Sequence, residues 1–264
     1  MNFAGKALPL QQNALDEIIG NLGCDGASLW SVIAVETSGQ GFWATKKPAI
    51  LFERHLFSRM TNNIYDNSHP DISNKEAGGY GASGEHQYAR LNAALALDQN
   101  AALASTSWGL GQVLGEHWKP LGYPSLQQFV SDMQDSESKQ LLAMAKFIQH
   151  NGLANDLKAR DWSNFARKYN GSNYAINHYD AKLAQHDELF KKGPLPDLRI
   201  RAAQLALTYL SLDNGKFDPH GVDGWMGRMT SAALAEFQRS KGLTASGTLD
   251  NTTYTDLIAA ANLS

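Results

Sequence analysis

The sequence predicts a mainly α-helical protein with a large N-terminal part and a small C-terminal part. The chain has 264 residues, and at roughly 100–200 residues per domain this fits one large domain or two unequal ones. Apolar residues recur at spacings of three and four over most of the chain. Two prolines and a glycine interrupt this pattern within residues 191–197, where no regular element can continue. We therefore expect two domains, residues 1–192 and residues 193–264.

Composition and charge argue against several classes of protein. Hydrophobic residues make up 43% of the chain and charged residues 19%, which is typical of a globular protein and not of a disordered one. The 23 basic and 26 acidic residues give a formal net charge of −3, so the basic excess of a nucleic-acid-binding protein is missing. The single cysteine, Cys24, excludes an intramolecular disulfide and any metal site that needs two thiolates. We expect no cofactor and no metal.

Helical faces account for most of residues 1–192. Each face is a set of apolar residues three and four positions apart, as in an amphipathic helix. The faces are Leu15, Ile18, Ile19 and Leu22; Leu29, Val32, Ile33 and Glu36; Tyr88, Leu91 and Leu95; Leu141, Leu142, Ala145 and Ile148; Trp162, Phe165, Ala166 and Tyr169; and Leu183, His186 and Phe190. Residues 48–53 form a short, continuous apolar run, which we interpret as a buried extended segment and hence a small β element.

Three further helices are predicted in residues 193–264, which we call the tail. The first has one apolar face, and a polar loop from Asp213 to Gly227 separates it from the second. Thr230 can cap the second helix and Asp250 the third. The three faces are Leu198, Ala202, Leu205, Tyr209 and Leu212; Ala233, Leu234 and Phe237; and Tyr254, Leu257, Ile258 and Ala261. The result is a small three-helix bundle whose core is just large enough to stand alone.

Glu36 is the most informative single residue. It lies on an apolar helix face, four residues after Val32, and we place it last in its helix, before Thr37. Burial and the negative end of the helix dipole would both raise its pKa. A carboxyl group of that kind can be protonated near neutral pH and act as a general acid. The pattern fits equally well a glutamate that turns outward in a frayed last turn.

Residues 107–113, Ser-Trp-Gly-Leu-Gly-Gln-Val, form a second candidate cluster. The two glycines permit a close approach of the backbone, Trp108 offers a flat apolar face of the kind that stacks on sugars, and Gln112 offers a donor and an acceptor. Taken alone, the stretch is better explained as the start of a helix with a tryptophan in the core.

Residues 169–174, Tyr-Asn-Gly-Ser-Asn-Tyr, form a third cluster after a helical face. Gly171 is a natural residue just beyond a helix end. Tyr169 and Asn170 then either project into a cleft or simply cap the helix before a polar loop. The local sequence does not separate these two interpretations.

The three clusters together resemble the lysozyme-like superfamily. Goose-type lysozymes and lytic transglycosylases carry Glu-Ser, Gly-Leu-Met-Gln and Tyr-Asn in this order, whereas this chain has Thr37 after the glutamate and Gly111 in place of methionine. Residues 48–57, Pro-Ala-Ile-Leu-Phe-Glu-Arg-His-Leu-Phe, resemble the signature of phage N-acetylmuramidase endolysins, and this resemblance spans roughly residues 10–190. It implies a lysozyme-like helical catalytic domain with a small β element.

This resemblance assigns roles to individual residues. Glu36 becomes the catalytic acid, and Glu53 becomes the candidate for a second catalytic carboxylate. Glu53 fits equally well a structural carboxylate that is paired with Arg54 or His55. The residues expected to bind substrate are Phe52, His55, Trp108, Gln112, Tyr169 and Asn170.

The tail carries a separate set of motifs. They are residues 201–207 (Arg-Ala-Ala-Gln-Leu-Ala-Leu), 222–227 (Val-Asp-Gly-Trp-Met-Gly), 230 (Thr), 237–239 (Phe-Gln-Arg) and 242–247 (Gly-Leu-Thr-Ala-Ser-Gly). Over residues 198–263 they resemble the type 1 peptidoglycan-binding domain, with Arg228 where the motif usually has proline or threonine. The resemblance makes Asp223, Trp225 and Arg228 candidates for contact with the cell wall, although packing and turn formation explain them equally well.

Both resemblances imply a phage endolysin that cleaves the β-1,4 bond between N-acetylmuramic acid and N-acetylglucosamine. Two other functions stay open: a lytic transglycosylase that leaves 1,6-anhydro products, and a catalytically silent wall-binding protein of a phage particle. The mechanism is also open, because a second carboxylate can activate water or attack the sugar, or the substrate's own acetamido group can complete the step.

We expect peptidoglycan as the partner of this protein, with no nucleic acid and no membrane insertion, and a monomeric state. Residues 7–10 are apolar but run directly into Gln11-Gln12-Asn13, which is too short for a secretory signal. No apolar run approaches the ~20 residues of a membrane helix. The expected location is therefore the cytoplasm of the bacterial host, followed by release to the periplasm and the cell wall.

Overall fold

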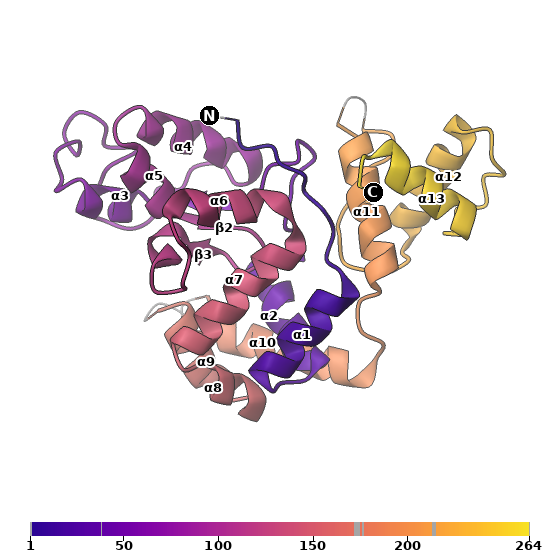
Figure 1. The fold of residues 1–264 in the computed structure, drawn as a ribbon, viewed down its shortest axis with the longest axis horizontal. Helices are drawn as coiled ribbons and strands as arrows, with labels where there is room; N and C mark the ends of the chain where they lie inside the picture. The colour runs from indigo at the N-terminus through magenta and orange to yellow at the C-terminus, as the bar shows by residue number, and fades with distance from the viewer. Residues whose placement is uncertain (1, 38, 172–174, 176, 213–214, 264) are drawn as a thin grey trace.

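The computed structural model describes residues 2–37, 39–171, 175, 177–212 and 215–263. It is mainly α-helical, and the helices of the tail stand beside those of the N-terminal part (Figure 1). Among the described residues, no single helix is both long and apolar enough to span a membrane. The first two helices, Gln12–Leu22 and Gly26–Thr37, are long and apolar enough only when taken together, and they meet at a bend of 107°.

The N-terminal part contains ten α-helices among the described residues, with three short strands and two short 3-10 helices. The helices are α1 (Gln12–Leu22), α2 (Gly26–Thr37), α3 (Arg54–Met60), α4 (Gln87–Leu95), α5 (Gln99–Ala104), α6 (Leu126–Asp135), α7 (Glu137–His150), α8 (Ala154–Ala159), α9 (Trp162–Tyr169) and α10 (Tyr179–Lys192). The 3-10 helices are η1 (Gly84–His86) and η2 (Gly115–Trp118), and the strands are β1 (Ile50–Phe52), β2 (Thr106–Trp108) and β3 (Val113–Leu114).

Helix α2 is the central helix of the N-terminal part. All its residues from Ala27 to Ile33 are buried, and it packs along α10. The preceding helix α1 is amphipathic, with Leu15, Ile18 and Leu22 buried, and it ends at Gly23, which adopts a left-handed conformation. The sequence therefore predicted the apolar face of α2 correctly but not its burial on every side.

The three strands form one small antiparallel sheet in the order β1-β2-β3. Ile50 lies opposite Trp108 in the β1–β2 pair, and Trp108 lies opposite Val113 in the β2–β3 pair. The prediction of a buried extended segment at residues 48–53 is confirmed by β1. The prediction of a helix start at residues 107–113 is wrong, because this stretch is a tight hairpin that turns at Gly109, which has a φ of 66°.

The tail is the expected bundle of three helices. They are α11 (Leu198–Leu210), α12 (Arg228–Ser240) and α13 (Asn251–Ala260). Asp250 caps α13 as predicted, because its carboxylate accepts a hydrogen bond from the Thr253 backbone N–H at 2.7 Å. Thr230 does not cap α12: the helix already begins at Arg228, and Thr230 is buried inside it, where it accepts a hydrogen bond from Gln204.

The core of the tail is completed by residues from the N-terminal part. Ala7 and Phe42, both fully buried, belong to the same apolar cluster as the buried residues of α11, α12 and α13. Tyr209 donates its hydroxyl hydrogen to the Ala7 carbonyl at 2.8 Å, and the Lys46 ammonium donates to the Ala261 carbonyl at 2.7 Å. Figure 1 shows the N-terminal segment running between the two parts. The tail core is therefore larger than the tail alone supplies.

Candidate active site

A cavity of about 300 Å³ lies where the end of α2 meets the small sheet and helices α7, α9 and α10. It brings together the three sequence clusters around Glu36, Gln112 and Tyr169, which are far apart along the chain. Its lining residues are Glu36, Leu51, Glu53, Ser107, Gly111, Gln112, Val113, Leu114, His117, Phe147, Tyr169, Asn170 and Tyr179.

Glu36 is half-buried at the cavity, one residue before the end of α2 at Thr37. Its Oε1 accepts a hydrogen bond from the Asn170 side-chain amide at 2.9 Å. Burial raises the pKa of Glu36 to about 7, and the Asn170 hydrogen bond opposes this rise. The sequence suggested burial and the helix dipole as causes of a raised pKa, and burial is the cause that is evident at Glu36. The carboxyl group can therefore carry a proton near neutral pH.

Tyr169 and Asn170 both line the cavity, as the sequence predicted. Asn170 caps the C-terminus of α9, and from this position its amide reaches Glu36. Tyr169 donates its hydroxyl hydrogen to the Gly111 carbonyl at 2.7 Å, and its ring stacks on Phe165 with centroids 5.3 Å apart. The Tyr169 side chain therefore connects α9 to the turn between β2 and β3. Residues 172–174 of this cluster lie outside the described residues.

Glu53 lines the same cavity from the N-terminus of α3. Burial raises its pKa, while the Tyr80 hydroxyl, 3.4 Å from Oε1, and the charge of Arg90 lower it. Neither expected structural partner, Arg54 or His55, donates a hydrogen bond to Glu53. Arg54 donates its Nε–H to the Glu76 carbonyl.

The contact of Glu53 with His55 is close but is not a hydrogen bond. His55 Nδ1 lies 3.2 Å from Glu53 Oε2, yet both atoms lack a partner of suitable geometry. Burial, together with nearby arginines, lowers the pKa of His55, which disfavours the charged ring that an ion pair with Glu53 would need. His55 is not among the residues that line the cavity.

The glycines of the Gly-Leu-Gly-Gln stretch allow the close approach that the sequence predicted. A Cβ atom on Gly111 would lie 2.5 Å from the Met144 Cβ, so only glycine fits against α7. Gln112, with a φ of 45°, donates its side-chain amide to the Gly109 carbonyl at 2.9 Å. Gln112 therefore lines the cavity and also fixes the turn.

Two residues expected to bind substrate are buried in the core. Trp108 and Phe52 are both 0% exposed. Trp108 packs against Phe3 and donates its indole N–H to the Leu103 carbonyl at 3.2 Å, and Phe52 packs against Phe57. We correct both assignments, because neither ring presents a face to the cavity.

Three aromatic residues of the cavity were not identified from the sequence. Tyr179, at the start of α10, has a raised pKa because of burial and the nearby Glu36. His117 has a pKa lowered by burial, and its ring lies 5.0 Å from that of Phe147. No local motif distinguishes these residues from ordinary core aromatics. Within the described ranges, no group of three or more His, Cys, Asp or Glu residues could hold a metal ion.

The three wall-binding candidates lie at the start of α12 and in the loop before it. Asp223 folds this loop, because its Oδ1 accepts hydrogen bonds from the Gln204 side chain at 2.8 Å and from the Trp225 backbone at 2.9 Å. Trp225 is 37% exposed, and Arg228 is exposed at the first position of α12. Asp223 and Trp225 also line a cavity of about 520 Å³ between the tail and helices α2 and α10.

Comparison with known proteins gives two family matches and a structural neighbour. The N-acetylmuramidase family matches residues 25–191, and the peptidoglycan binding domain family matches residues 197–257. Among solved structures, the crystal structure of the Burkholderia AP3 phage endolysin is similar, with a TM-score of 0.64 and 35% sequence identity over 70% of this chain and 73% of that chain. A search of curated proteins found no match.

Proposed function

Because the chain belongs to the N-acetylmuramidase family, we propose that it is a peptidoglycan hydrolase of the endolysin type. It cleaves the β-1,4 bond between N-acetylmuramic acid and N-acetylglucosamine, and its tail holds the enzyme on the cell wall. In the same proposal, residues 1–192 form the catalytic domain and residues 193–264 form the wall-binding domain.

The observation that carries this function is the position of Glu36 in the cavity, where burial raises the pKa of its carboxyl group and Asn170 donates a hydrogen bond to it. A glycosidic oxygen is a poor leaving group until it receives a proton, and Glu36 has its pKa raised to about 7 within the cavity. We assign Glu36 as the general acid that protonates this oxygen. Asn170 orients the carboxyl group, and Tyr169, Gln112, Tyr179 and His117 line the space for the sugar units.

Glu53 is our candidate for the second carboxylate. As the C–O bond breaks, positive charge develops on the sugar ring; a carboxylate in the same cavity then either takes a proton from the water that attacks the anomeric carbon or attacks that carbon itself. Support comes from the place of Glu53 in the same cavity and from the lack of a hydrogen bond to it from Arg54 or His55. Tyr80 and Arg90 favour its ionised form.

Neither alternative function is favoured. The family match is to N-acetylmuramidases and the structural neighbour is a phage endolysin, and both point away from a transglycosylase or a catalytically silent phage protein. On the basis of the sequence, we also propose that the protein is a monomer that binds no nucleic acid and does not insert into a membrane. We propose that it is made in the cytoplasm of the bacterial host.

In the tail, we propose that Trp225 contacts the wall directly and that Asp223 shapes the loop that presents it. The indole of Trp225 is partly exposed, whereas the carboxylate of Asp223 is occupied by Gln204 and by the backbone of Trp225. Arg228 is an additional exposed contact at the start of α12.

Two single variants test the hydrolase and the wall-binding proposals together. Glu36→Gln should lose at least about 100-fold of its rate on peptidoglycan, because the acid is gone, and should still sediment with insoluble cell walls. Trp225→Ala should hydrolyse soluble peptidoglycan fragments normally but sediment less. Mass spectrometry of the products should show hydrolysed reducing ends. Full activity of Glu36→Gln would refute the assignment, and anhydro ends would replace the hydrolase with a transglycosylase.

A further inference from the structure

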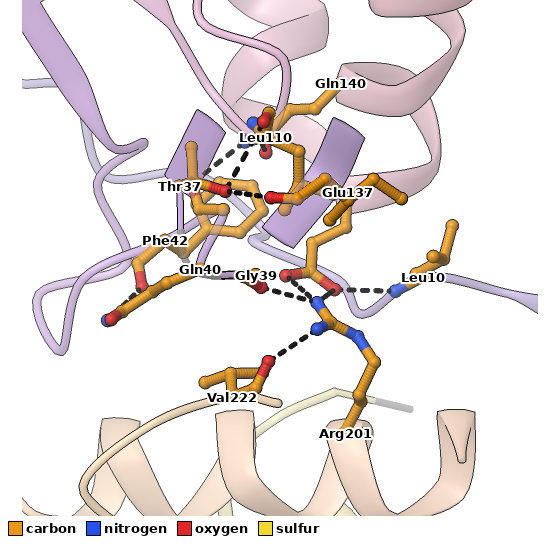
Figure 2. A network of polar contacts seen from close by, with 12 residues as sticks. Leu10, Thr37, Gly39, Gln40, Phe42, Leu110, Glu137, Gln140, Arg201 and Val222 are labelled. Atoms are coloured by element: carbon orange, nitrogen blue, oxygen red, sulfur yellow. Dashed lines mark hydrogen bonds and ion pairs between the residues drawn. The ribbon is translucent and has the colours of Figure 1, made fainter. Parts of the chain in front are cut away.

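A single arginine of the tail reaches into the N-terminal part beside the candidate active site. Arg201 lies one turn into α11, and its side chain is only 1% exposed. Figure 2 shows its guanidinium group pointing out of the tail toward Glu137 and Gly39. Arg201 is the first residue of the tail motif at residues 201–207, but the proposed wall binding does not explain why a buried arginine stands there.

The guanidinium group joins three segments of the chain. Its Nη2 donates to the Gly39 carbonyl at 2.8 Å and to the Glu137 carboxylate at 3.0 and 3.1 Å. Its Nη1 donates to the Val222 carbonyl, in the loop of the tail itself. Its Cζ also lies 5.2 Å from the centroid of the Trp30 ring on α2. Arg201 therefore contacts both α2 and the segment that follows it.

The contact with Gly39 lies three residues after Glu36, immediately beyond the end of α2. Gly39 has a φ of 82°, and a Cβ atom there would lie 3.0 Å from the Val222 carbonyl oxygen and 3.1 Å from Arg201 Nη1. Only a glycine leaves room for the guanidinium group and the tail loop at this point. The exit of the chain from α2 is thus fitted closely to the tail.

A second connection runs through α7 to the other side of the cavity. Glu137 begins α7, and Gln140, one turn later, accepts the Leu110 backbone N–H at 3.0 Å and donates to the Gly41 carbonyl at 3.2 Å. The Leu110 carbonyl in turn accepts the Thr37 hydroxyl hydrogen at 3.4 Å. Figure 2 shows these contacts as one network. Thr37 follows Glu36, and Leu110 precedes Gly111 in the cavity wall.

A buried charge pair of this kind fixes geometry more than it adds stability, because desolvation offsets most of the attraction. The planar guanidinium group holds several acceptors in fixed directions, which a lysine ammonium cannot do. We propose that Arg201 is a positioning residue of the active site: it holds the end of α2, and with it Glu36, in the catalytic geometry only while the tail is docked. This inference rests on the proposed role of Glu36 as the acid.

The proposal makes the tail part of the catalytic machinery as well as an anchor. A general acid must lie within hydrogen-bond reach of the oxygen that it protonates, and a misplacement of about 1 Å can cost roughly 100-fold in rate. Loss of the Arg201 contacts releases the Gly39 carbonyl just after α2, while the Gly41 carbonyl keeps its hydrogen bond from Gln140. None of the described residues of the tail lines the cavity around Glu36, so binding of small substrates should change much less than turnover.

The test uses full-length variants and soluble peptidoglycan fragments, so that wall anchoring does not affect the rate. The double variant Arg201→Met/Glu137→Met replaces the charge pair with apolar side chains and keeps the interface packed. Arg201→Lys keeps the positive charge but loses the planar group whose N–H donors point in fixed directions. Arg199→Met is the matched control, because Arg199 lies on the same helix and contacts Asn251 and Tyr254 within the tail. Melting temperature, kcat, KM and the pH dependence of kcat are measured for each.

The double variant should fold and lose at least about tenfold in kcat, with KM changed by less than about twofold. Its rate should begin to fall at a lower pH than that of the wild type, because a displaced, more solvated Glu36 has a lower pKa. Arg201→Lys should lie between the double variant and the wild type, and Arg199→Met should match the wild type.

A wild-type kcat and pH profile in the double variant would overturn the proposal and leave Arg201 as a purely structural contact. If the double variant does not fold, Arg201→Lys decides by the same two criteria. The proposed function is tested separately by Glu36→Gln: if that variant is inactive while the Arg201 variants keep their kcat, only the positioning role fails.

Discussion

Glu36 and Glu137 are two glutamates at opposite ends of helices, the first half-buried at the cavity and the second fully buried, and their surroundings differ. Glu36 lies at the C-terminal end of α2, where the helix dipole disfavours a negative charge, and it has one neutral hydrogen-bond donor, Asn170. Glu137 lies at the N-terminal end of α7, where the dipole favours its charge. Glu137 also receives the Arg201 guanidinium group and the Leu10 backbone N–H.

The comparison shows that burial alone does not make a carboxyl group reactive. The protein compensates the charge of Glu137 completely, and the result is a fixed joint between the N-terminal part and the tail. It leaves the charge of Glu36 poorly compensated, and the result is an acid whose proton is available near neutral pH. We therefore expect variants of Glu137 to affect mainly the stability of the protein, and variants of Glu36 to affect mainly its catalytic chemistry.

The largest expected effect is the loss of stability in Glu137→Gln. The variant leaves the Arg201 guanidinium group buried without a counter-charge, which should lower the free energy of unfolding by about 3–5 kcal/mol. Urea denaturation at pH 7 measures this change. The matched control is Glu236→Gln, which breaks the exposed pair of Glu236 with Arg239 and should cost less than about 1 kcal/mol. Equal losses in the two variants would contradict the contrast.

A gain in stability is expected for Glu36→Gln at alkaline pH. The folded protein holds the Glu36 proton more tightly than the unfolded chain, with a pKa of about 7 against 4.5. The wild type therefore loses stability as the pH rises from 4.5 to 7, and the loss persists above pH 7. At pH 8 the variant should be more stable by up to about 3 kcal/mol, and below pH 4 the two should be equal. A less stable variant at pH 8 would show that the carboxylate is well compensated.

The smallest effect concerns Asn170, the donor on which the carboxylate form of Glu36 depends. The wild-type rate on soluble fragments should fall as the pH rises through about 7, because the acid loses its proton. Asn170→Ala removes a hydrogen bond to the carboxylate, so the pKa of Glu36 should rise and the fall in rate should begin at higher pH, by less than about one unit. Asn164→Ala, on the same helix, is the control, because the Asn164 side chain contacts Asp161 and Arg167 and not Glu36. A shift to lower pH would contradict the assigned role of Asn170.

Much of the fold could be predicted from the sequence, because its helices are long and periodic. The helix faces and the three helices of the tail depend on local spacing, which the sequence shows directly, whereas the extended segment at residues 48–53 was indicated by its continuous apolar run. The hairpin at residues 106–114 could not be predicted in this way, since its strands are only three and two residues long. Strands this short carry no period of their own.

The site was partly predictable for the same reason. Glu36 stood out as a charge on an apolar face, whereas the pattern could not show which face of an aromatic residue meets solvent, so Trp108 and Phe52 were assigned to the cavity although both lie in the core. The sequence also contains a signal for the ion pair between Arg201 and Glu137. Arg201 lies three residues after Leu198 and four before Leu205, and Glu137 lies four before Leu141, so both are charges on apolar faces. Their pairing depends on tertiary contacts that no spacing reveals.

The shared core of the tail also determines when the molecule can finish folding. Tyr209 bonds to Ala7 across 202 positions of the sequence, and Lys46 bonds to Ala261 across 215. Ala7 and Lys46 thus wait for Tyr209 and Ala261, which are made later, although domains usually complete their folding in order during synthesis. A nascent or truncated chain would expose Phe42 and leave Glu137 without its cation, so cellular proteases would recognise it readily. Quality control by the cell should therefore favour molecules whose synthesis has reached the last helix.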